Sequence, residues 1–249
     1  WANPAKAHRC GAPRGRTPGL LAGWRPRLPP GTVLGQVTSV AIDPEDGAVW
    51  CLTRQTAGPL QTPVSPGGAT LYMSSAGEAL RWTKPVLAFD AESGELLREW
   101  GGPGAGYDWP DAPHGIHVAS GRVWIAGGFH NWPPPLPNKT HDRMVLSFDR
   151  QGNFVKQMGR PFARTEGNGD TENLNRPCSL AVDARANEVF VADGYGNSRV
   201  VVLDADSLAY KRHWVSGEHQ PHAPPRGDQK DPLRPFTFME PHALALAED

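Results

Sequence analysis

Histidine side chains recur at one position of a repeat in this sequence. His114 and His242 each follow a proline, and the other copies of the repeat carry Thr38 and Cys178 at that position. Zinc is commonly bound by imidazole, and a zinc site needs three or four such ligands. Two histidines in register can therefore supply part of a zinc site if the fold points them at one place. The alternative for each is a satisfied histidine that starts a strand.

Two further side chains follow apolar runs and could act beside such a metal. Tyr195 stands between two glycines, so a turn presents it, and a phenol can accept a proton where a cation favours the phenolate. Arg54 can hold a carboxylate with two hydrogen bonds. A structural role competes with this interpretation, because Asp193 and Asn197 can cap the turn and Arg199 can pair with Asp193.

The elements that would position these residues are short strands in two alternating pairs. Each run has four to seven residues, is rich in β-branched or aromatic side chains, and is bounded by turn residues. The predicted inner strands are 37–43 with 48–52, 113–118 with 122–127, and 177–183 with 188–194, and another copy starts at 241–246. The predicted outer strands are 86–90 with 96–101, 144–149 with 154–159, and 200–204 with 210–214.

Four strands per repeat, recurring every 64 to 76 residues, predict an all-β fold of propeller blades with long insertions. No stretch between the strands has a sustained helical period, which argues against a βαβ fold. A β-sandwich would not predict such close internal copies. In a propeller the inner strands face the central channel, so equivalent residues of successive blades converge near the axis.

We expect residues 1–33 to form a poorly ordered segment and residues 34–249 to form part of a propeller. The blades are expected near residues 34–102, 113–160, 177–216 and 241–249. Propellers need about four to eight blades to remove their open edges. Three blades and one further strand therefore predict a truncated chain, or a partner that supplies the remaining blades.

Composition excludes several classes of partner. The formal net charge of -1 gives no long-range field for a nucleic acid, so none is expected as a partner. No run of 18 apolar residues exists, so no membrane segment is predicted. The oligomeric state is not predicted.

The three cysteines Cys10, Cys51 and Cys178 are odd in number and scattered, which favours free thiols over a disulfide framework.

Several motifs resemble the NHL-repeat propellers, and among them the peptidyl-α-hydroxyglycine α-amidating lyase family. The similar segments are GQVTSVAIDPEDGAVWCLTR (Gly35 to Arg54), PHGI (Pro113 to Ile116), VFVADGYGNSR (Val189 to Arg199) and PHAL (Pro241 to Leu244). Bacterial NHL proteins of unproven activity also share stretches like NGDTENLNRP (Asn168 to Pro177). The resemblance covers roughly residues 35–249. It implies a propeller with six blades in full length, and it favours an extracellular or secreted protein.

The resemblance also implies site residues. Zinc would be held by His114 and His242, with a third histidine two blades later, beyond residue 249. Calcium in the channel would be held partly by the backbone carbonyls of Val40 and Ile116. The tyrosine and arginine of the family would be Tyr195 and Arg54. The implied reaction cleaves the carbon–nitrogen bond of a C-terminal α-hydroxyglycine to a peptide amide and glyoxylate, so the partner in the channel would be a peptide or small-molecule substrate.

The sequence departs from the family at two places. The cysteines of the family's disulfide would fall at Asn175 and Gly196, and both are absent. The insertion at Asn131–Asn138, rich in tryptophan and proline, has no clear counterpart and could cover the channel mouth. A second hypothesis therefore stays open, in which the chain is a non-catalytic propeller that binds proteins or, less favoured by its charge, RNA.

Overall fold

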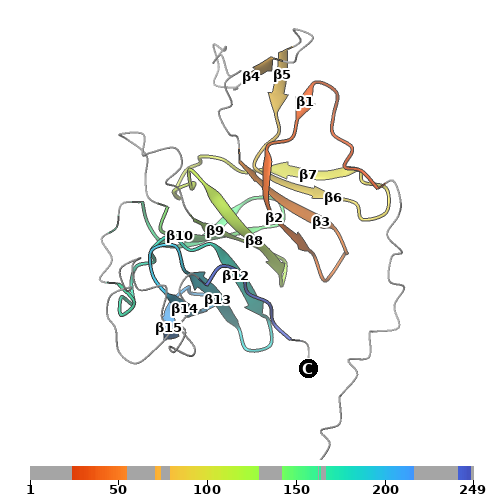
Figure 1. Ribbon diagram of the computed structural model, residues 1–249. Helices are drawn as coiled ribbons and strands as arrows, with labels where there is room; N and C mark the ends of the chain where they lie inside the picture. Colours follow the sequence, from red (N-terminus) through yellow and green to blue (C-terminus); the bar gives the residue numbers. More distant parts are fainter. Residues whose placement is uncertain are drawn as a thin grey trace, which may run out of the picture.

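A computed structural model of the chain describes residues 24–54, 71–73, 79–128, 142–161, 163, 167–215 and 241–247. All regular secondary structure in these residues is β-strand, as predicted (Figure 1). The insertion at 131–138 lies outside the described residues, as do residues 1–23 with Cys10. Within the described part of the chain, no helix is long and apolar enough to cross a membrane.

Twelve strands form three antiparallel sheets of four strands, and each sheet follows the predicted inner and outer pairs. Blade one contains β2 (Gln36–Ile42), β3 (Val49–Arg54), β6 (Val86–Phe89) and β7 (Leu96–Trp100), in that order. Blade two contains β8 (Pro113–Ala119), β9 (Arg122–Gly127), β10 (Met144–Asp149) and β11 (Phe154–Gly159). Blade three contains β12 (Ser179–Asp183), β13 (Glu188–Asp193), β14 (Arg199–Asp204) and β15 (Tyr210–Val215).

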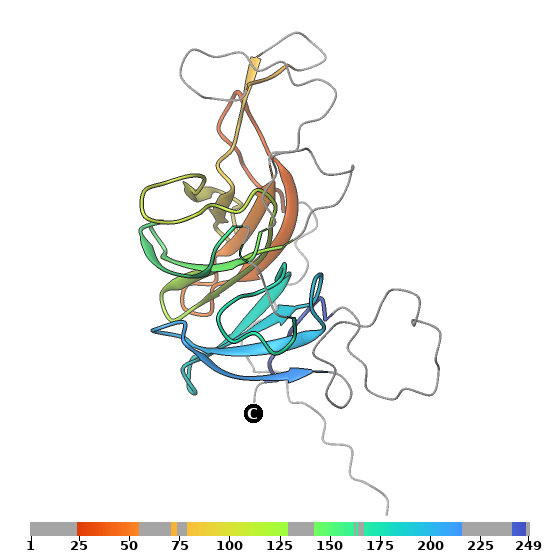
Figure 2. The same ribbon diagram turned by 90° about the vertical axis from the view of Figure 1, so that its left-hand side faces the viewer.

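The three sheets lie side by side, with their first strands neighbouring one another (Figures 1 and 2). β8 contacts both β2 and β12, and the Ile116 amide donates a 3.2 Å hydrogen bond to Ser39 Oγ across the first of these interfaces. One apolar core fills the space between blades one and two, and a second fills the space between blades two and three. The described residues therefore form consecutive blades of a β-propeller.

Strand pairing confirms the alignment of the repeats. Ser39 pairs with Leu52, and Gly115 pairs with Ala126 at the equivalent place in blade two. The register shifts just before each of these pairs, at Thr38 and at His114. Such a shift takes one side chain out of the regular alternation of the strand. The predicted column of equivalent residues is thus a real structural position.

One face of β2 differs from the matching faces of the other first strands. Val40 and Ile42 are 54% and 58% exposed, whereas Ile116 and Val118, at the same positions of β8, are 5% and 2% exposed. Blade one covers these residues of β8. No blade among the described residues precedes β2, and its apolar face therefore stays exposed.

A small sheet that the sequence did not predict joins blade one. β1 (Thr32–Val33) pairs in parallel with β5 (Ala79–Trp82), which pairs with β4 (Leu71–Met73). The Arg27 amide also donates a 2.8 Å hydrogen bond to the Gly94 carbonyl. Residues 24–33, predicted to be poorly ordered, thus contact blade one. Main-chain hydrogen bonds hold them, and these leave little trace in side-chain pattern.

The last described segment, residues 241–247, passes beside blade three without forming a strand. Cys178 Sγ donates a 3.1 Å hydrogen bond to the Pro241 carbonyl, and the backbone of Pro241 lies where a side chain at Gly194 would be. The strand predicted at 241–246 is not observed. No described residue follows this segment that could pair with it as the next strand. The segment nevertheless carries His242 to the end of blade three.

Candidate active site

Three predicted site residues meet at one oxygen atom. Tyr195 Oη lies 3.1 Å from His114 Nε2 and 2.6 Å from His242 Nε2. The two imidazole rings have centroids 5.0 Å apart and are nearly perpendicular. His114 comes from the start of β8, Tyr195 from the loop after β13, and His242 from the segment beyond blade three. Two blades and the following segment therefore converge as the repeat column predicts.

The tautomer of His114 follows from its second ring nitrogen. Nδ1 lies 2.8 Å from the Cys178 carbonyl, which can only accept a hydrogen bond, so Nδ1 carries a proton. Burial lowers the pKa of His114 and favours the neutral ring. Nε2 then presents a lone pair toward the Tyr195 oxygen. Metal-binding histidines typically donate their other N–H to a carbonyl in this way.

Glycines allow the blades to approach closely around His114. A Cβ atom at Gly115 would lie 2.7 Å from the Cys178 carbonyl oxygen, which is the atom that accepts from His114. A Cβ atom at Gly128 would lie 2.5 Å from the Pro177 carbonyl oxygen. Real Cβ atoms do not approach backbone oxygens so closely, so larger residues would push blade three away and move the acceptor of His114.

The turn that presents Tyr195 is fixed by a buried ion pair. Arg199 Nε donates a 2.9 Å hydrogen bond to Asp193 Oδ2, and both side chains are fully buried. Asn197 Nδ2 donates to the same carboxylate oxygen at 2.8 Å. The Arg199 guanidinium also donates to the backbone carbonyls of residues 168, 170 and 173. The structural role predicted for these residues is confirmed, and it serves to hold Tyr195 in place.

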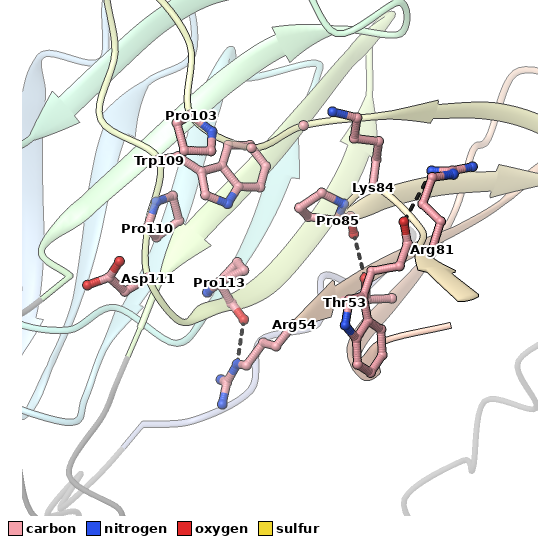
Figure 3. Close-up of a pocket in the computed structure, with 13 residues that line it drawn as sticks. Thr53, Arg54, Arg81, Lys84, Pro85, Pro103, Trp109, Pro110, Asp111 and Pro113 are labelled. Atoms are coloured by element: carbon pink, nitrogen blue, oxygen red, sulfur yellow. Dashed lines mark hydrogen bonds between the residues drawn. The ribbon is translucent and has the colours of Figure 1, made fainter. Parts of the chain in front are cut away.

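Arg54 lies at the end of β3 on the wall of a cleft between blades one and two (Figure 3). Its Nε donates a 2.9 Å hydrogen bond to the Pro113 carbonyl, next to His114 in sequence. Burial lowers the pKa of Arg54, and the nearby charges of Tyr195 and Asp142 raise it in part. Arg54 is thus close enough to Tyr195 for their charges to interact, and a cation there favours the phenolate.

Asp142 is a buried group at this site that was not predicted from the sequence. Its Oδ1 and Oδ2 accept hydrogen bonds from the amides of Asp111 and Ala112, at 3.0 and 2.7 Å. These residues lead into Pro113, the acceptor of Arg54. Burial raises the pKa of Asp142 to about 7 despite these bonds. A single aspartate after an insertion carries no pattern, so only the fold identifies it.

The two residues expected to bind calcium occupy matching positions of neighbouring strands. Val40 in β2 pairs with Cys51, and Ile116 in β8 pairs with Ile125, each one residue after the pair that follows the register shift. The two strands are in contact. Backbone carbonyls are oxygen ligands that suit calcium. A shared ion at these carbonyls stays a prediction.

The positions of the absent disulfide are adjacent in space. The Gly196 amide donates a 2.9 Å hydrogen bond to the Asn175 carbonyl. A Cβ atom at Gly196 would overlap the Asn175 side chain, which fills the space that a second cysteine would need. Among the described residues Cys51 and Cys178 are free thiols, and burial, with a smaller contribution from the charge of Asp193, raises the pKa of Cys178 to about 12.

The donor set is incomplete for zinc. No cluster of three histidine, cysteine, aspartate or glutamate side chains in the described part of the chain is arranged to hold a metal ion. His114 Nε2 and His242 Nε2 nevertheless face one point, with the phenol oxygen between them. Imidazole nitrogens suit zinc, and the tautomer of His114 leaves its Nε2 free to bind a metal, so the residues present fit two positions of such a site.

Comparisons with known proteins show limited similarity. No family model matches the sequence. The chain is 25% identical to peptidylglycine alpha-amidating monooxygenase of Rattus norvegicus over 163 residues, which are 65% of this chain and 14% of the rat protein.

Several solved structures are similar to this chain at low sequence identity. BamB from Moraxella catarrhalis has 17% identity over 73% of this chain and 38% of its own, with a TM-score of 0.36. The WD40 repeats of RRP9 have 10% identity over 72% and 38%, with a TM-score of 0.40. The computationally designed Ika4 protein has 12% identity over 89% of both chains, with a TM-score of 0.41.

Proposed function

We propose that this chain belongs to a zinc-dependent lyase of the peptidyl-α-hydroxyglycine amidating type. The observation that carries the proposal is the meeting of His114 Nε2 and His242 Nε2 at the Tyr195 oxygen. The similarity to a rat protein whose name describes peptidylglycine amidation supports the same chemistry. The matched residues make up 14% of the rat protein, so the proposal concerns the lyase step alone and not the whole activity of that protein.

The proposed reaction balances without any redox partner. The hydroxyl of the α-hydroxyglycine loses its proton, its carbon–oxygen bond becomes a carbonyl, and the carbon–nitrogen bond breaks. The amide nitrogen keeps the electron pair of that bond and takes up a proton. The products are a peptide amide and glyoxylate, and together they contain all the atoms of the substrate.

Tyr195 is the proposed base. Its oxygen stands where two imidazole nitrogens converge, and the charge of Arg54 acts on it. A phenolate there would take the proton from the substrate hydroxyl and return it to the leaving nitrogen. The turn held by Arg199 and Asp193 keeps the phenol in reach, which lowers the entropic cost of proton transfer.

Arg54 is proposed to bind the carboxylate of the substrate. A guanidinium can grip a carboxylate with two parallel hydrogen bonds, and the hydrogen bond from Arg54 to Pro113 uses Nε and not the two Nη atoms. His114 and His242 would hold zinc by Nε2 and would transfer no proton. When bound, zinc supplies Lewis acidity that favours loss of the hydroxyl proton.

Glyoxylate release from an N-acyl-peptidyl-α-hydroxyglycine tests the proposal. We expect turnover by the zinc-loaded protein and a loss of about 100- to 10,000-fold in kcat for Tyr195→Phe, as for other proton-transfer groups. Tyr210→Phe is the matched control, because the Tyr210 hydroxyl shares a hydrogen bond with His213 within blade three. Absence of turnover, or equal loss in both variants, would contradict the proposal and favour a binding propeller.

A further inference from the structure

The cleft beside Arg54 is large enough to bind part of a ligand. It has a volume of about 380 Å³ and opens between blades one and two. Arg54 lies on one side of it, Lys84 on another, with Pro85 between them and with Trp109 and Pro110 across the opening (Figure 3). The cleft shares Arg54 with the site around Tyr195, so the two adjoin at this residue.

One wall of the cleft is apolar and held in place by packing. Trp109 packs edge-on against Tyr107, with ring centroids 6.5 Å apart, and lies 6.0 Å from the ring of Phe148. Pro110 is buried. Preformed apolar walls with few polar groups are typical of ligand pockets. The cleft can therefore bind the aliphatic part of a side chain without reorganising.

The charges around the cleft favour an anion. Arg81 is paired with Glu99 by two hydrogen bonds of 2.9 and 3.3 Å, so its charge is balanced. Lys84 donates its backbone amide to Glu99 at 2.7 Å, while its exposed amine is in no ion pair among the described residues. Asp111 is the single carboxylate among the described lining residues. Because Arg54 holds the terminal carboxylate in the proposed function, the exposed amine of Lys84 is the cation left for the preceding residue, and Asp111 lies on the other side of the cleft (Figure 3).

We propose that this cleft binds the residue before the hydroxyglycine and prefers an acidic side chain there. The inference rests on the proposed function, in which Arg54 holds the terminal carboxylate and Tyr195 faces the hydroxyl. The preceding residue then lies beside Arg54, where the cleft opens. Its methylene groups contact Pro85 and Trp109, and its carboxylate lies near the Lys84 amine. The substrate class is therefore a peptide ending in Glu or Asp followed by hydroxyglycine.

Binding of unreactive peptides tests this preference without requiring turnover. Fluorescein-labelled Tyr-Glu-Gly and Tyr-Gln-Gly lack the hydroxyl and differ in one charge. We expect the Glu peptide to bind roughly 3- to 10-fold more tightly at low salt, with the ratio falling as salt screens the pair. Lys84→Gln should remove the preference and Lys84→Glu should invert it, as measured by fluorescence anisotropy.

Lys156→Gln is the matched control, because Lys156 is an exposed lysine of blade two outside the cleft. Equal affinity for both peptides, or an unchanged ratio in Lys84→Glu, would overturn the inference. The two proposals fail separately. A charge preference without glyoxylate release would contradict the lyase and leave the cleft as a peptide site, whereas glyoxylate release without the preference would contradict the cleft alone.

Discussion

Arg54 ends the second strand of blade one and Tyr195 follows the second strand of blade three, but the two blades hold them differently. In blade three a fully buried ion pair between Arg199 and Asp193 fixes the turn that carries Tyr195. In blade one the Arg54 side chain donates a hydrogen bond to the Pro113 carbonyl of the neighbouring blade. The phenol is thus positioned within its own blade, and the guanidinium is positioned between blades.

This difference separates two kinds of sensitivity. Damage to the core of blade three should displace Tyr195 and lower stability together. Loss of the hydrogen bond from Arg54 to Pro113 should displace Arg54 and leave most of the stability intact, because the apolar core between blades one and two does not depend on it. The histidines depend on a third contact, because His114 is oriented by a carbonyl of blade three. The predictions below change one of these contacts at a time.

The largest effect is expected for Arg199→Met. It leaves the Asp193 carboxylate buried without its cation and removes the bonds to three backbone carbonyls. Removal of one partner of a buried pair costs about 3–5 kcal/mol of the free energy of unfolding. Denaturation by urea would measure it. Arg212→Gln is the control, because the Arg212 side chain is 45% exposed and its partner Glu188 can still pair with Lys211.

If Arg199→Met and Arg212→Gln shift the urea midpoint equally, the turn of Tyr195 does not depend on the buried pair. The account of blade three would then be wrong.

The next effect is a pH dependence from Asp142. Its pKa in the folded chain is about 7, above its ordinary value of 3.8, because it is buried. The folded state therefore binds the proton more tightly, and the free energy of unfolding should fall as pH rises from about 4 to about 7. At about 1.4 kcal/mol per pKa unit, the fall is on the order of 4 kcal/mol.

Asp142→Asn should flatten this fall, as urea titrations at several pH values would reveal. The variant also weakens the acceptor for residues 111 and 112 and should raise the KM for a carboxylate substrate through Arg54. Asp149→Asn is the control, since the turn bonds of Asp149 lower its pKa, so its contribution changes below pH 4. A slope that is identical in wild type and Asp142→Asn would contradict the assignment.

The smallest of these effects is expected for Gly115→Ala. The new methyl group would meet the Cys178 carbonyl, the acceptor of His114. Loss of an oriented second hydrogen bond typically lowers metal affinity by about 10- to 100-fold. Zinc titration would measure it, with Gly169→Ala as control because nothing lies within 4 Å of a Cβ atom there. Equal affinity in the two variants would show that the carbonyl does not orient His114.

The sequence allowed the strands and the column of equivalent residues to be predicted because both depend on repetition. All twelve blade strands occur within about two residues of their predicted bounds. The pairing of Arg199 with Asp193 was also predictable, because the turn residues cap each other locally. A strand at 241–246 was not observed, since a strand requires a partner that no described residue supplies.

The remaining features could not be predicted because they arise from contacts between distant segments. β1, β4 and β5 are short and held by main-chain bonds. Asp142 becomes important only where the fold buries it beneath residues 111 and 112. The cleft combines residues of two blades, and no pattern along the chain brings Lys84 near Trp109. Such contacts can be identified only from the three-dimensional structure.

Zinc uptake by single-histidine variants tests the central claim most directly. Equilibrium dialysis followed by metal analysis should find one zinc per wild-type chain, and a loss of at least about 10-fold in affinity for both His114→Ala and His242→Ala. His117→Ala, altered in the same strand as His114, should bind like wild type. Wild-type protein without zinc, or His114→Ala with full zinc content, would contradict the claim that His114 and His242 hold one ion beside Tyr195.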